Sequence, residues 1–365
     1  MKKRSLITLL IAFAMIVAAC SSGDADDTTT TQAAAPETTT TTQADWPDKI
    51  VYGFIPSEQA DTLGDTIQPY MDFLSSELGI EVEGVVTQDY NGLVVAMGAG
   101  QADVGAFGPF GYVQAANLYD NIEVLIQSIR FGSATYHGQW FTNDASICDE
   151  APAPGALENS ADGPVLVDPF DAVALQVGIG FGDEGKEPEL LEDGTSVDAG
   201  LACQASLEKV VGRTVAFTSA TSTSGSVYPS LQLLNLGIDL ENDITYSYLG
   251  SHTDTVAAVY NGDFEIGLSF DDARRNIRKD SPDVGSKVIV FNITEEIPND
   301  VVVVNGDLPD SLKQAIYDAT AAFLDSEEGV ALFDEIYGWT DIQPAIDSDF
   351  DIVREAAEKL GIEGD

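Results

Sequence analysis

The chain has 365 residues, enough for about two domains, and 44% of them are hydrophobic, so a sizeable core can form. It carries 61 Asp and Glu residues against 16 Lys and Arg residues, which gives a formal net charge of −45. A polyanion gains nothing from counterion release on DNA or RNA and is repelled by an anionic membrane surface, so we expect no nucleic-acid partner and a solvated acidic exterior.

Residues 1–20 predict a lipoprotein signal peptide. Three basic residues at 2–4 precede an almost wholly apolar run at 6–19, which is shorter than a typical membrane span. Residues 17–20 are similar to the bacterial lipobox, in which the cysteine, here Cys20, is lipidated and becomes the mature N-terminus. A plain signal peptide cleaved nearby is the alternative. We therefore expect a membrane-anchored protein on the extracytoplasmic face of the cell membrane.

Residues 21–46 predict a flexible linker. This segment contains two threonine runs, at 28–31 and 38–42, and nothing that could bury a core. A coil of this length has an end-to-end distance of roughly 25–30 Å. The linker would hold a folded domain away from a membrane surface.

The cysteine count leaves one pair for the folded region. Outside the cytoplasm the pair Cys148 and Cys203 is more typical of a disulfide than of a metal site. The chain has only two histidines, His137 and His252, so it has no thiolate and imidazole cluster suited to zinc, and we expect no metal.

The folded region starts near residue 49 with alternating strands and helices. Apolar runs predict strands, and spaced apolar residues that end at glycine predict helices. This order indicates a parallel α/β sheet. The expected strands are 50–55, 82–86 and 104–107, and the expected helices lie near 57–79 and 90–98.

The second half repeats this order. Strands are expected at 214–217 and 244–248, a helix at 227–236, and a further helix from His252. An offset of 162 residues aligns 94–105 with 256–267 and places Tyr90 on His252. Two similar α/β lobes with corresponding helix starts at a shared cleft explain the repeat; chance similarity between two βαβ units is the alternative.

Between the halves, residues 143–205 break the pattern. The segment is rich in Asp, Glu, Gly and Pro and contains both Cys148 and Cys203. We interpret it as an acidic insertion on the second lobe that a disulfide holds across its base. It could serve as a partner-docking surface or as decoration, and the sequence favours neither.

The turn Ser222, Thr223 and Ser224 lies directly after a strand and before a helix. Such a turn directs backbone N–H groups and hydroxyls to one point with the helix dipole behind them, which makes an anion site without fixed positive charge. We therefore expect neutral donors, rather than cations, to bind the anion. A simple helix cap is the alternative.

Six short motifs in register carry a resemblance to a known family. They are Asp89-Tyr90, 100–105, 108–112, 222–225, 250–252 and 297–300. Together they resemble the phosphate, phosphite and phosphonate substrate-binding proteins of ABC importers, over about residues 49–361 apart from the insertion. The resemblance implies a type II periplasmic-binding-protein fold, with two similar α/β lobes around a central cleft joined by a two-strand hinge. Lobe I would be 47–140 plus 305–365, lobe II would be 141–304, and the hinge would lie near 138–143 and 298–305.

The resemblance also implies a set of ligand-binding residues. Those expected to hold the phosphonate oxygens are Ser222, Thr223, Ser224 and His252, and Tyr90 and Tyr136 are expected to close over them. In members that bind aminoalkylphosphonates two acidic residues meet the ammonium group, and the corresponding positions here are Asp272 and Asp300. Each residue also has a structural alternative: an ion pair of Asp272 with Arg274 or Arg275, a turn cap at Asp300, and a core role for His252 or the tyrosines.

The implied function is that of an extracytoplasmic solute-binding component, a monomer that delivers a phosphonate or related phosphorus oxyanion to an ABC permease. We find no GxSxG, HExxH or EF-hand motif, and we expect neither catalysis nor a cofactor. The alternatives are a sensory binding protein for the same ligand class and an exported phosphoryl hydrolase.

Overall fold

The computed structural model describes residues 45–57, 60–130, 132–167 and 200–362. The predicted signal peptide, Cys20 and almost all of the predicted linker lie outside the described residues, as does the part of the insertion at 168–199. Among the helices within these ranges, none has both the length and the apolar composition needed to cross a bilayer.

The first sheet has six strands in the order β17-β4-β16-β3-β1-β2. Strand β1 pairs in parallel with β2 and β3, whereas β16 runs antiparallel between β3 and β4. The strands come from both ends of the described chain, so the C-terminal segment completes this lobe. The strands are β1 (Lys49–Phe54), β2 (Glu81–Val86), β3 (Val104–Phe107), β4 (Ile122–Ile129), β16 (Val301–Asn305) and β17 (Asp341–Pro344).

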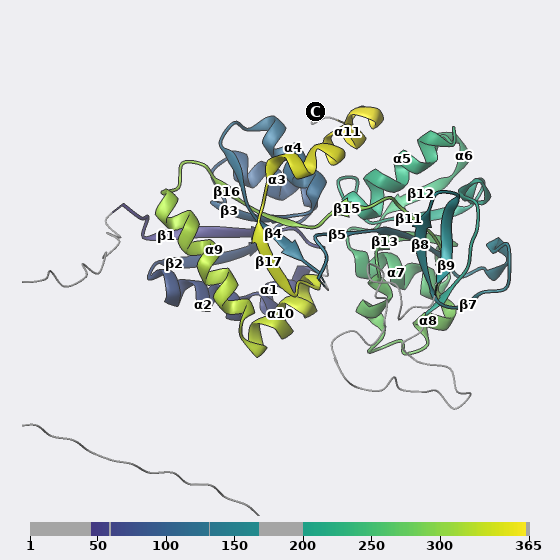
Figure 1. Cartoon of the computed structure of the whole chain (residues 1–365), viewed down its shortest axis with the longest axis horizontal. Coiled ribbons are helices and arrows are strands. Elements are labelled where there is room, and N and C mark those ends of the chain that lie inside the picture. The colour runs from purple at the N-terminus through teal and green to yellow at the C-terminus, as the bar shows by residue number, and fades with distance from the viewer. Residues whose placement is uncertain (1–44, 58–59, 131, 168–199, 363–365) are drawn as a thin grey trace, which may run out of the picture. The chain divides into compact units, whose positions relative to one another are not determined.

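Helices cover both faces of this sheet, because alternate residues of each strand point to opposite sides. The side of β1 that carries Ile50, Tyr52 and Phe54 packs in one apolar cluster with α2, α9 and α10 (Figure 1). The opposite side packs against α3, α4 and α11. The helices are α1 (Ala60–Thr66), α2 (Gln68–Leu78), α3 (Tyr90–Gly98), α4 (Pro109–Leu118), α9 (Asp310–Leu324), α10 (Glu327–Tyr337) and α11 (Asp351–Leu360).

The second sheet has seven strands in the order β12-β11-β13-β6-β14-β10-β7. Its centre is fully buried, with Trp140 and Leu268 at 0% exposure on neighbouring strands. The strands are β6 (Gly138–Thr142), β7 (Ala153–Pro154), β10 (Leu201–Ala202), β11 (Thr214–Phe217), β12 (Thr245–Tyr248), β13 (Ile266–Phe270) and β14 (Ile289–Ile293). The helices of this lobe are α5 (Tyr228–Asn235), α6 (Leu240–Asp243), α7 (His252–Asn261) and α8 (Val284–Lys287).

The two sheets contain the predicted repeat. The order β2-β1-β3 in one sheet corresponds to β12-β11-β13 in the other, with parallel pairing in both. Helices α3 and α7 begin in the same way, since Asp89 Oδ1 accepts from the Gly92 N–H and Ser251 Oγ accepts from the Asp254 N–H. Tyr90 and His252 are thus the first residues of equivalent helices. The α/β fold with two similar lobes is confirmed.

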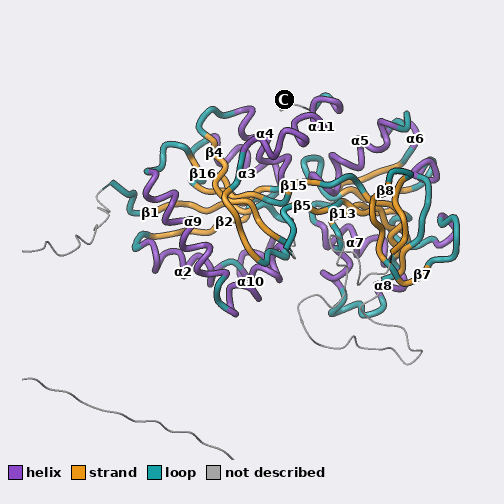
Figure 2. Tube along the Cα trace, in the orientation of Figure 1, coloured by secondary structure: helices purple, strands orange, loops and turns teal. Residues whose placement is uncertain are grey.

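The chain passes between the sheets through a short pair of antiparallel strands, β5 (Thr135–Tyr136) and β15 (Ile297–Pro298) (Figure 2). This crossing begins earlier in each segment than the hinge ranges 138–143 and 298–305 that the sequence predicts, and it overlaps the second range at Pro298. Those ranges contain β6 and β16, each of which pairs with a strand on both sides within its own sheet. Their apolar side chains, such as Phe141 and Val303, are buried.

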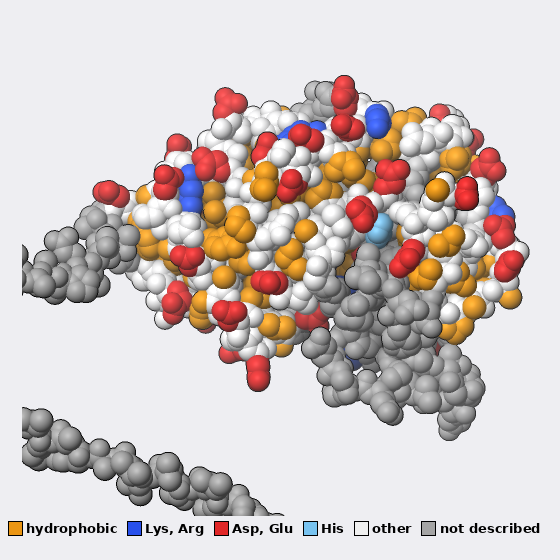
Figure 3. Space-filling view, viewed as in Figure 1, with side chains coloured by type: hydrophobic (Ala, Val, Ile, Leu, Met, Phe, Trp, Pro, Cys, Tyr) orange, Lys and Arg blue, Asp and Glu red, His pale blue; other side chains and the backbone are white. Residues whose placement is uncertain are grey.

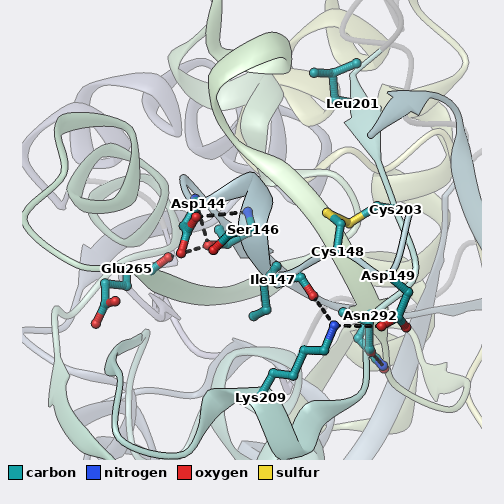
Figure 4. The surroundings of a disulfide bond; sticks show 12 residues. Asp144, Ser146, Ile147, Cys148, Asp149, Leu201, Cys203, Lys209, Glu265 and Asn292 are labelled. Atoms are coloured by element: carbon teal, nitrogen blue, oxygen red, sulfur yellow. Dashed lines mark hydrogen bonds and ion pairs between the residues drawn. A yellow bond between two sulfur atoms is a disulfide. The ribbon is translucent and has the colours of Figure 1, made fainter. Parts of the chain in front are cut away.

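The insertion adds strands to the edge of the second sheet. β7 and β10 extend that sheet, and β8 (Ala156–Ser160) forms a separate hairpin with β9 (Gly163–Val167). A disulfide joins Cys148 to Cys203, with 5.7 Å between their Cα atoms, which is the pairing that the sequence predicts (Figure 4). Beside it Lys209 Nζ donates to the Ile147 carbonyl and to Asp149 at 2.6 Å (Figure 4).

Acidic side chains are spread over the face of the molecule shown in Figure 3. They occur on many elements of this face, and basic side chains are few there. This distribution fits a surface solvated by carboxylates rather than a concentrated charged patch.

Candidate functional site

A cavity of about 600 Å³, including the space open to solvent, lies between the two lobes. Its walls come from the segment after β1, the starts of α3 and α7, the turn after β11, and the end of α10. Seven of the eight predicted ligand-binding residues line it: Tyr90, Tyr136, Ser222, Thr223, Ser224, His252 and Asp300.

The serine-rich turn forms the start of a helix. Ser222 Oγ accepts from the Gly225 N–H at 3.2 Å and caps the π-helical turn η3 (Thr223–Val227), which continues into α5. The first backbone bonds of this helix run from Val227 and Tyr228 back to Ser222 and Thr223. The N–H groups of the first residues therefore precede any intrahelical acceptor and are suited to an anion.

Gly225 allows this turn to pack closely against β11. An added Cβ at Gly225 would lie 2.3 Å from Thr218 Oγ1. That hydroxyl donates to the Leu268 carbonyl at 3.1 Å and lies 3.3 Å from His252 Nδ1. Because Gly225 has no side chain, the turn can pack against Thr218, whose hydroxyl also contacts His252.

His252 is held with one ring nitrogen engaged. Its Nδ1 lies 2.7 Å from Ser269 Oγ, and its ring centroid lies 4.8 Å from that of Phe270. Burial, together with the positive charge of Arg130, lowers the pKa of His252 to about 3. The imidazole is therefore neutral at pH 7 and binds as a hydrogen-bonding group.

Two of the hydrogen bonds between described residues at this cavity connect the two lobes. The Phe110 N–H, in the first turn of α4, donates to Thr223 Oγ1 at 2.9 Å. The His252 N–H donates to the Ser57 carbonyl at the same distance. Residues of the cavity wall therefore also bridge the two lobes.

Ser57 is a wall residue that sequence reasoning missed. It is 8% exposed, and its hydroxyl has no hydrogen-bond partner among the described residues. A buried hydroxyl without a partner costs free energy, so such a group at a cavity wall is suited to a ligand or water. The only sequence signal is its place after the strand and Pro56.

Asp272 does not line the cavity, which corrects the predicted contact with a ligand ammonium group. Its carboxylate is 2% exposed and accepts from Arg274 Nε and Nη2 at 2.9 and 2.7 Å. Arg274 Nη1 in turn donates to the carbonyls of Leu201 and Val288. Both charges are used within a buried pair at the start of η4 (Ala273–Ile277). The ion-pair alternative accounts for Asp272, but the pair is internal.

Asp300 does reach the cavity. Trp339 Nε1 donates to it at 3.5 Å, and an ideal Cβ on Gly108 would be 3.9 Å from Asp300 Oδ1 and 3.6 Å from Thr223 Oγ1. Burial raises the pKa of Asp300, and the charge of Arg130 opposes that rise. The acid therefore lies close to the serine-rich turn and beside a cation.

Two arginines line the cavity, contrary to the expectation of neutral donors alone. Arg130 is 8% exposed, and its Cζ lies 5.2 Å from the Tyr136 ring centroid and 5.0 Å from that of Phe270. Arg275 Cζ lies 5.3 Å from the same Phe270 centroid. Arg130 directly follows β4, whereas four residues separate Arg275 from the end of β13, so the sequence places both after strands but does not indicate that they share one cavity.

The buried carboxyl of Asp271, near the site, should make the free energy of unfolding depend on pH. Burial raises the pKa of its carboxyl to about 8, well above an unfolded value near 4, so folding favours the protonated form. The resulting stabilisation is complete below about pH 4 and is lost as pH rises toward 8. Between about pH 6.5 and 8 we expect a loss of up to ~2 kcal/mol in unfolding free energy, at ~1.4 kcal/mol per pH unit.

Urea unfolding at these two pH values tests this prediction, with Asp271→Asn as the comparison. The variant keeps the shape of the side chain but cannot ionise, so its stability should lose this pH dependence. Equal slopes for the two proteins would show that Asp271 ionises normally in the fold.

Comparison with known proteins gives one family and several similar structures. A family model described as ABC transporter, phosphonate, periplasmic substrate-binding protein matches residues 52–350. The phosphate-import protein PhnD of Mycolicibacterium smegmatis is 24% identical over 340 residues, which cover 87% of this chain and 88% of that protein.

Two solved structures share the fold. PhnD1 of Prochlorococcus marinus, in complex with methylphosphonate, has a TM-score of 0.64 at 18% identity, covering 87% of this chain and 99% of its own. A binding protein component of an ABC phosphonate transporter from Pseudomonas aeruginosa has a TM-score of 0.60 at 17% identity, covering 86% of each chain.

Proposed function

Since the chain belongs to the family of periplasmic phosphonate-binding proteins of ABC transporters, we propose that it captures a phosphonate or related phosphorus oxyanion in the interlobe cavity. Members of this family are non-catalytic, extracytoplasmic substrate-binding components of phosphonate or phosphate importers. The proposal concerns the ligand and the residues that hold it.

The observation that carries the proposal is the meeting of the serine-rich turn, His252 and Tyr90 at one cavity. The N–H groups of Thr223 and Ser224 and the hydroxyls of Ser222, Thr223 and Ser224 donate to the oxyanion, whereas the Ser222 N–H already donates to the Ser219 carbonyl. When the Ser269 hydroxyl donates to Nδ1 of the neutral His252, the proton is left on Nε2, which becomes a further donor. Tyr90 and Tyr136 close over the anion from the other walls.

The free energy available from these donors is adequate. A hydrogen bond to a charged group contributes roughly 1.5–3 kcal/mol, so four such bonds supply roughly 6–12 kcal/mol. Micromolar affinity requires about 8 kcal/mol. The short-range donors can therefore overcome the unfavourable long-range potential of the acidic surface.

Binding should be coupled to closure of the lobes, with the lobe of the first sheet as one body and the lobe of the second sheet as the other. The two strands β5 and β15 are the proposed hinge, because both chain crossings run through this pair. The hydrogen bonds Phe110–Thr223 and Ser57–His252 hold the closed arrangement at the site itself. An ABC permease would recognise this closed form.

Lipidation at Cys20 is a separate part of the proposal, supported by the sequence of residues 1–20. Metabolic labelling with a fatty-acid analogue should mark the wild-type chain, whereas Cys20→Ala should be unlabelled and released from the membrane fraction. An unlabelled wild-type chain would contradict the anchor without bearing on the ligand.

Calorimetry on the full chain in detergent tests the ligand class. Methylphosphonate, 2-aminoethylphosphonate, phosphite and phosphate are the ligands, and sulfate, which is also tetrahedral, is the control. At least one phosphorus oxyanion should bind, and Thr223→Ala should weaken it by about tenfold or more through the lost hydrogen bond. No heat with all four, from protein that melts cooperatively, would reject the proposal.

A further inference from the structure

The segment after β1 places a serine at the cavity wall on a constrained turn. The Ser57 N–H donates to the Ile55 carbonyl at 2.9 Å, which closes a three-residue turn around Pro56. The proline ring fixes φ at the centre of this turn. The Tyr337 hydroxyl, at the end of α10, donates to the same Ile55 carbonyl at 3.4 Å, so the first lobe also holds the turn. The backbone of Ser57 is therefore fixed within its own lobe.

The backbone of Ser57 is also bonded to the second lobe. Its carbonyl accepts from the N–H of His252, the first residue of α7, at 2.9 Å. Both backbone polar groups of Ser57 are thus used, and they fix the point from which its side chain starts. The positive end of the α7 dipole lies here, which favours the charged oxygens of an anion over an uncharged organic tail. Ser57 therefore lies at the end of the cavity that suits the oxyanion.

The hydroxyl of Ser57 differs from those of the serine-rich turn. Ser222 Oγ accepts from the Gly225 N–H, and Thr223 Oγ1 accepts from the Phe110 N–H. Ser57 Oγ has no hydrogen-bond partner among the described residues, although the residue is 8% exposed and lines the cavity. Leaving a buried hydroxyl without a partner costs free energy in the empty protein. An oxygen of a bound anion would supply the missing partner.

On the basis of the proposed function, we infer that Ser57 is a further ligand-binding residue, whose hydroxyl donates to an oxygen of the phosphonate or related oxyanion from the first lobe. The serine-rich turn and His252 supply donors from the second lobe. Because Ser57 and this turn belong to different lobes, they can hold the same anion only when the lobes are closed. The hydroxyl thus links recognition of the oxyanion to closure.

Calorimetry with Ser57→Ala, on the full chain in detergent, tests this inference. The ligands are phosphite, phosphate, methylphosphonate and 2-aminoethylphosphonate, which share the oxyanion and differ in one substituent on phosphorus. Loss of one hydrogen bond to a charged group corresponds to binding that is about tenfold to 100-fold weaker. We expect a loss by a similar factor for each ligand that the wild-type protein binds, because the contact is with the shared oxygens.

The stability of the empty protein separates ligand binding from a structural role. Removing a buried hydroxyl that has no partner leaves no unpaired group behind, so ligand-free Ser57→Ala should be no less stable to urea than the wild type. Ser128→Ala is the matched control, because the Ser128 hydroxyl also has no partner among the described residues, and this residue is 0% exposed and does not line the cavity. The control should keep wild-type affinity for every ligand.

The outcomes distinguish the inference from the proposed function. Wild-type affinity in Ser57→Ala overturns the inference, and so does a loss confined to 2-aminoethylphosphonate, which would place the hydroxyl at the organic tail. Lower stability of the ligand-free variant, or an equal loss of affinity in Ser128→Ala, shows an indirect effect through the fold and also overturns it. Failure of the wild-type protein to bind any of the four ligands rejects the proposed function itself.

Discussion

Replacing Gly225 by alanine is expected to abolish ligand binding. The added Cβ would lie 2.3 Å from Thr218 Oγ1, 2.6 Å from Thr218 Cβ and 3.0 Å from Ser222 Oγ, so the turn must move away from β11. This movement displaces both the serine-rich turn and the hydroxyl beside His252. Loss of two charge-assisted bonds weakens affinity by about 100-fold or more.

Titration of methylphosphonate, or of the tightest ligand found, measures the effect. Gly64→Ala is the matched control, because Gly64 lies in α1 with nothing within 4 Å of an added Cβ. That change should leave affinity as it is and stabilise the helix by up to ~1 kcal/mol. Wild-type affinity in Gly225→Ala would show that the turn can relax without loss of its donors.

Removal of the disulfide should have the largest effect on stability. The bond between Cys148 and Cys203 closes a loop with a sequence separation of 55. In the chain-entropy model a loop of this length contributes ~4 kcal/mol, so Cys148→Ala with Cys203→Ala should lower the unfolding free energy by about that amount. Affinity should be kept under conditions where the variant is folded, because neither cysteine lines the cavity.

Urea denaturation of the double variant measures this loss, and reduced wild-type protein provides an independent comparison. Both should unfold at a similar, lower urea concentration, with an m-value for the variant that reflects a less constrained unfolded chain. A difference below about 1 kcal/mol would mean that the neighbouring contacts, such as those of Lys209, hold the base of the insertion without the bond.

The features that sequence reasoning predicted correctly depend on local patterns. The repeat was visible because α3 and α7 use the same apolar spacing and equivalent capping residues, Asp89 and Ser251. The serine-rich turn was visible because its three hydroxyl residues are consecutive between a strand and a helix. Such patterns fix the strands, the helices and much of the cavity wall without reference to distant residues.

The cationic part of the cavity could not be predicted in this way. Arg130 reaches the cavity because the Tyr337 carbonyl, more than 200 residues later, holds its guanidinium. Asp272 does not reach the cavity because its carboxylate accepts hydrogen bonds from Arg274. Arg274 also donates to the carbonyl of Leu201, which is distant in sequence. Each outcome depends on which partner the tertiary fold brings near, and local sequence does not contain that information.

The hydrogen bond from the Phe110 N–H to Thr223 Oγ1 has a consequence for how the empty and filled forms differ. A hydroxyl that accepts one bond becomes a better donor through its own proton, because hydrogen bonds in series polarise one another. The Phe110 N–H of one lobe therefore strengthens the hydrogen bond that the Thr223 hydroxyl of the other lobe donates to the ligand. Thr223 Oγ1 therefore binds the ligand most strongly when the lobes are closed and the bond from the Phe110 N–H is formed.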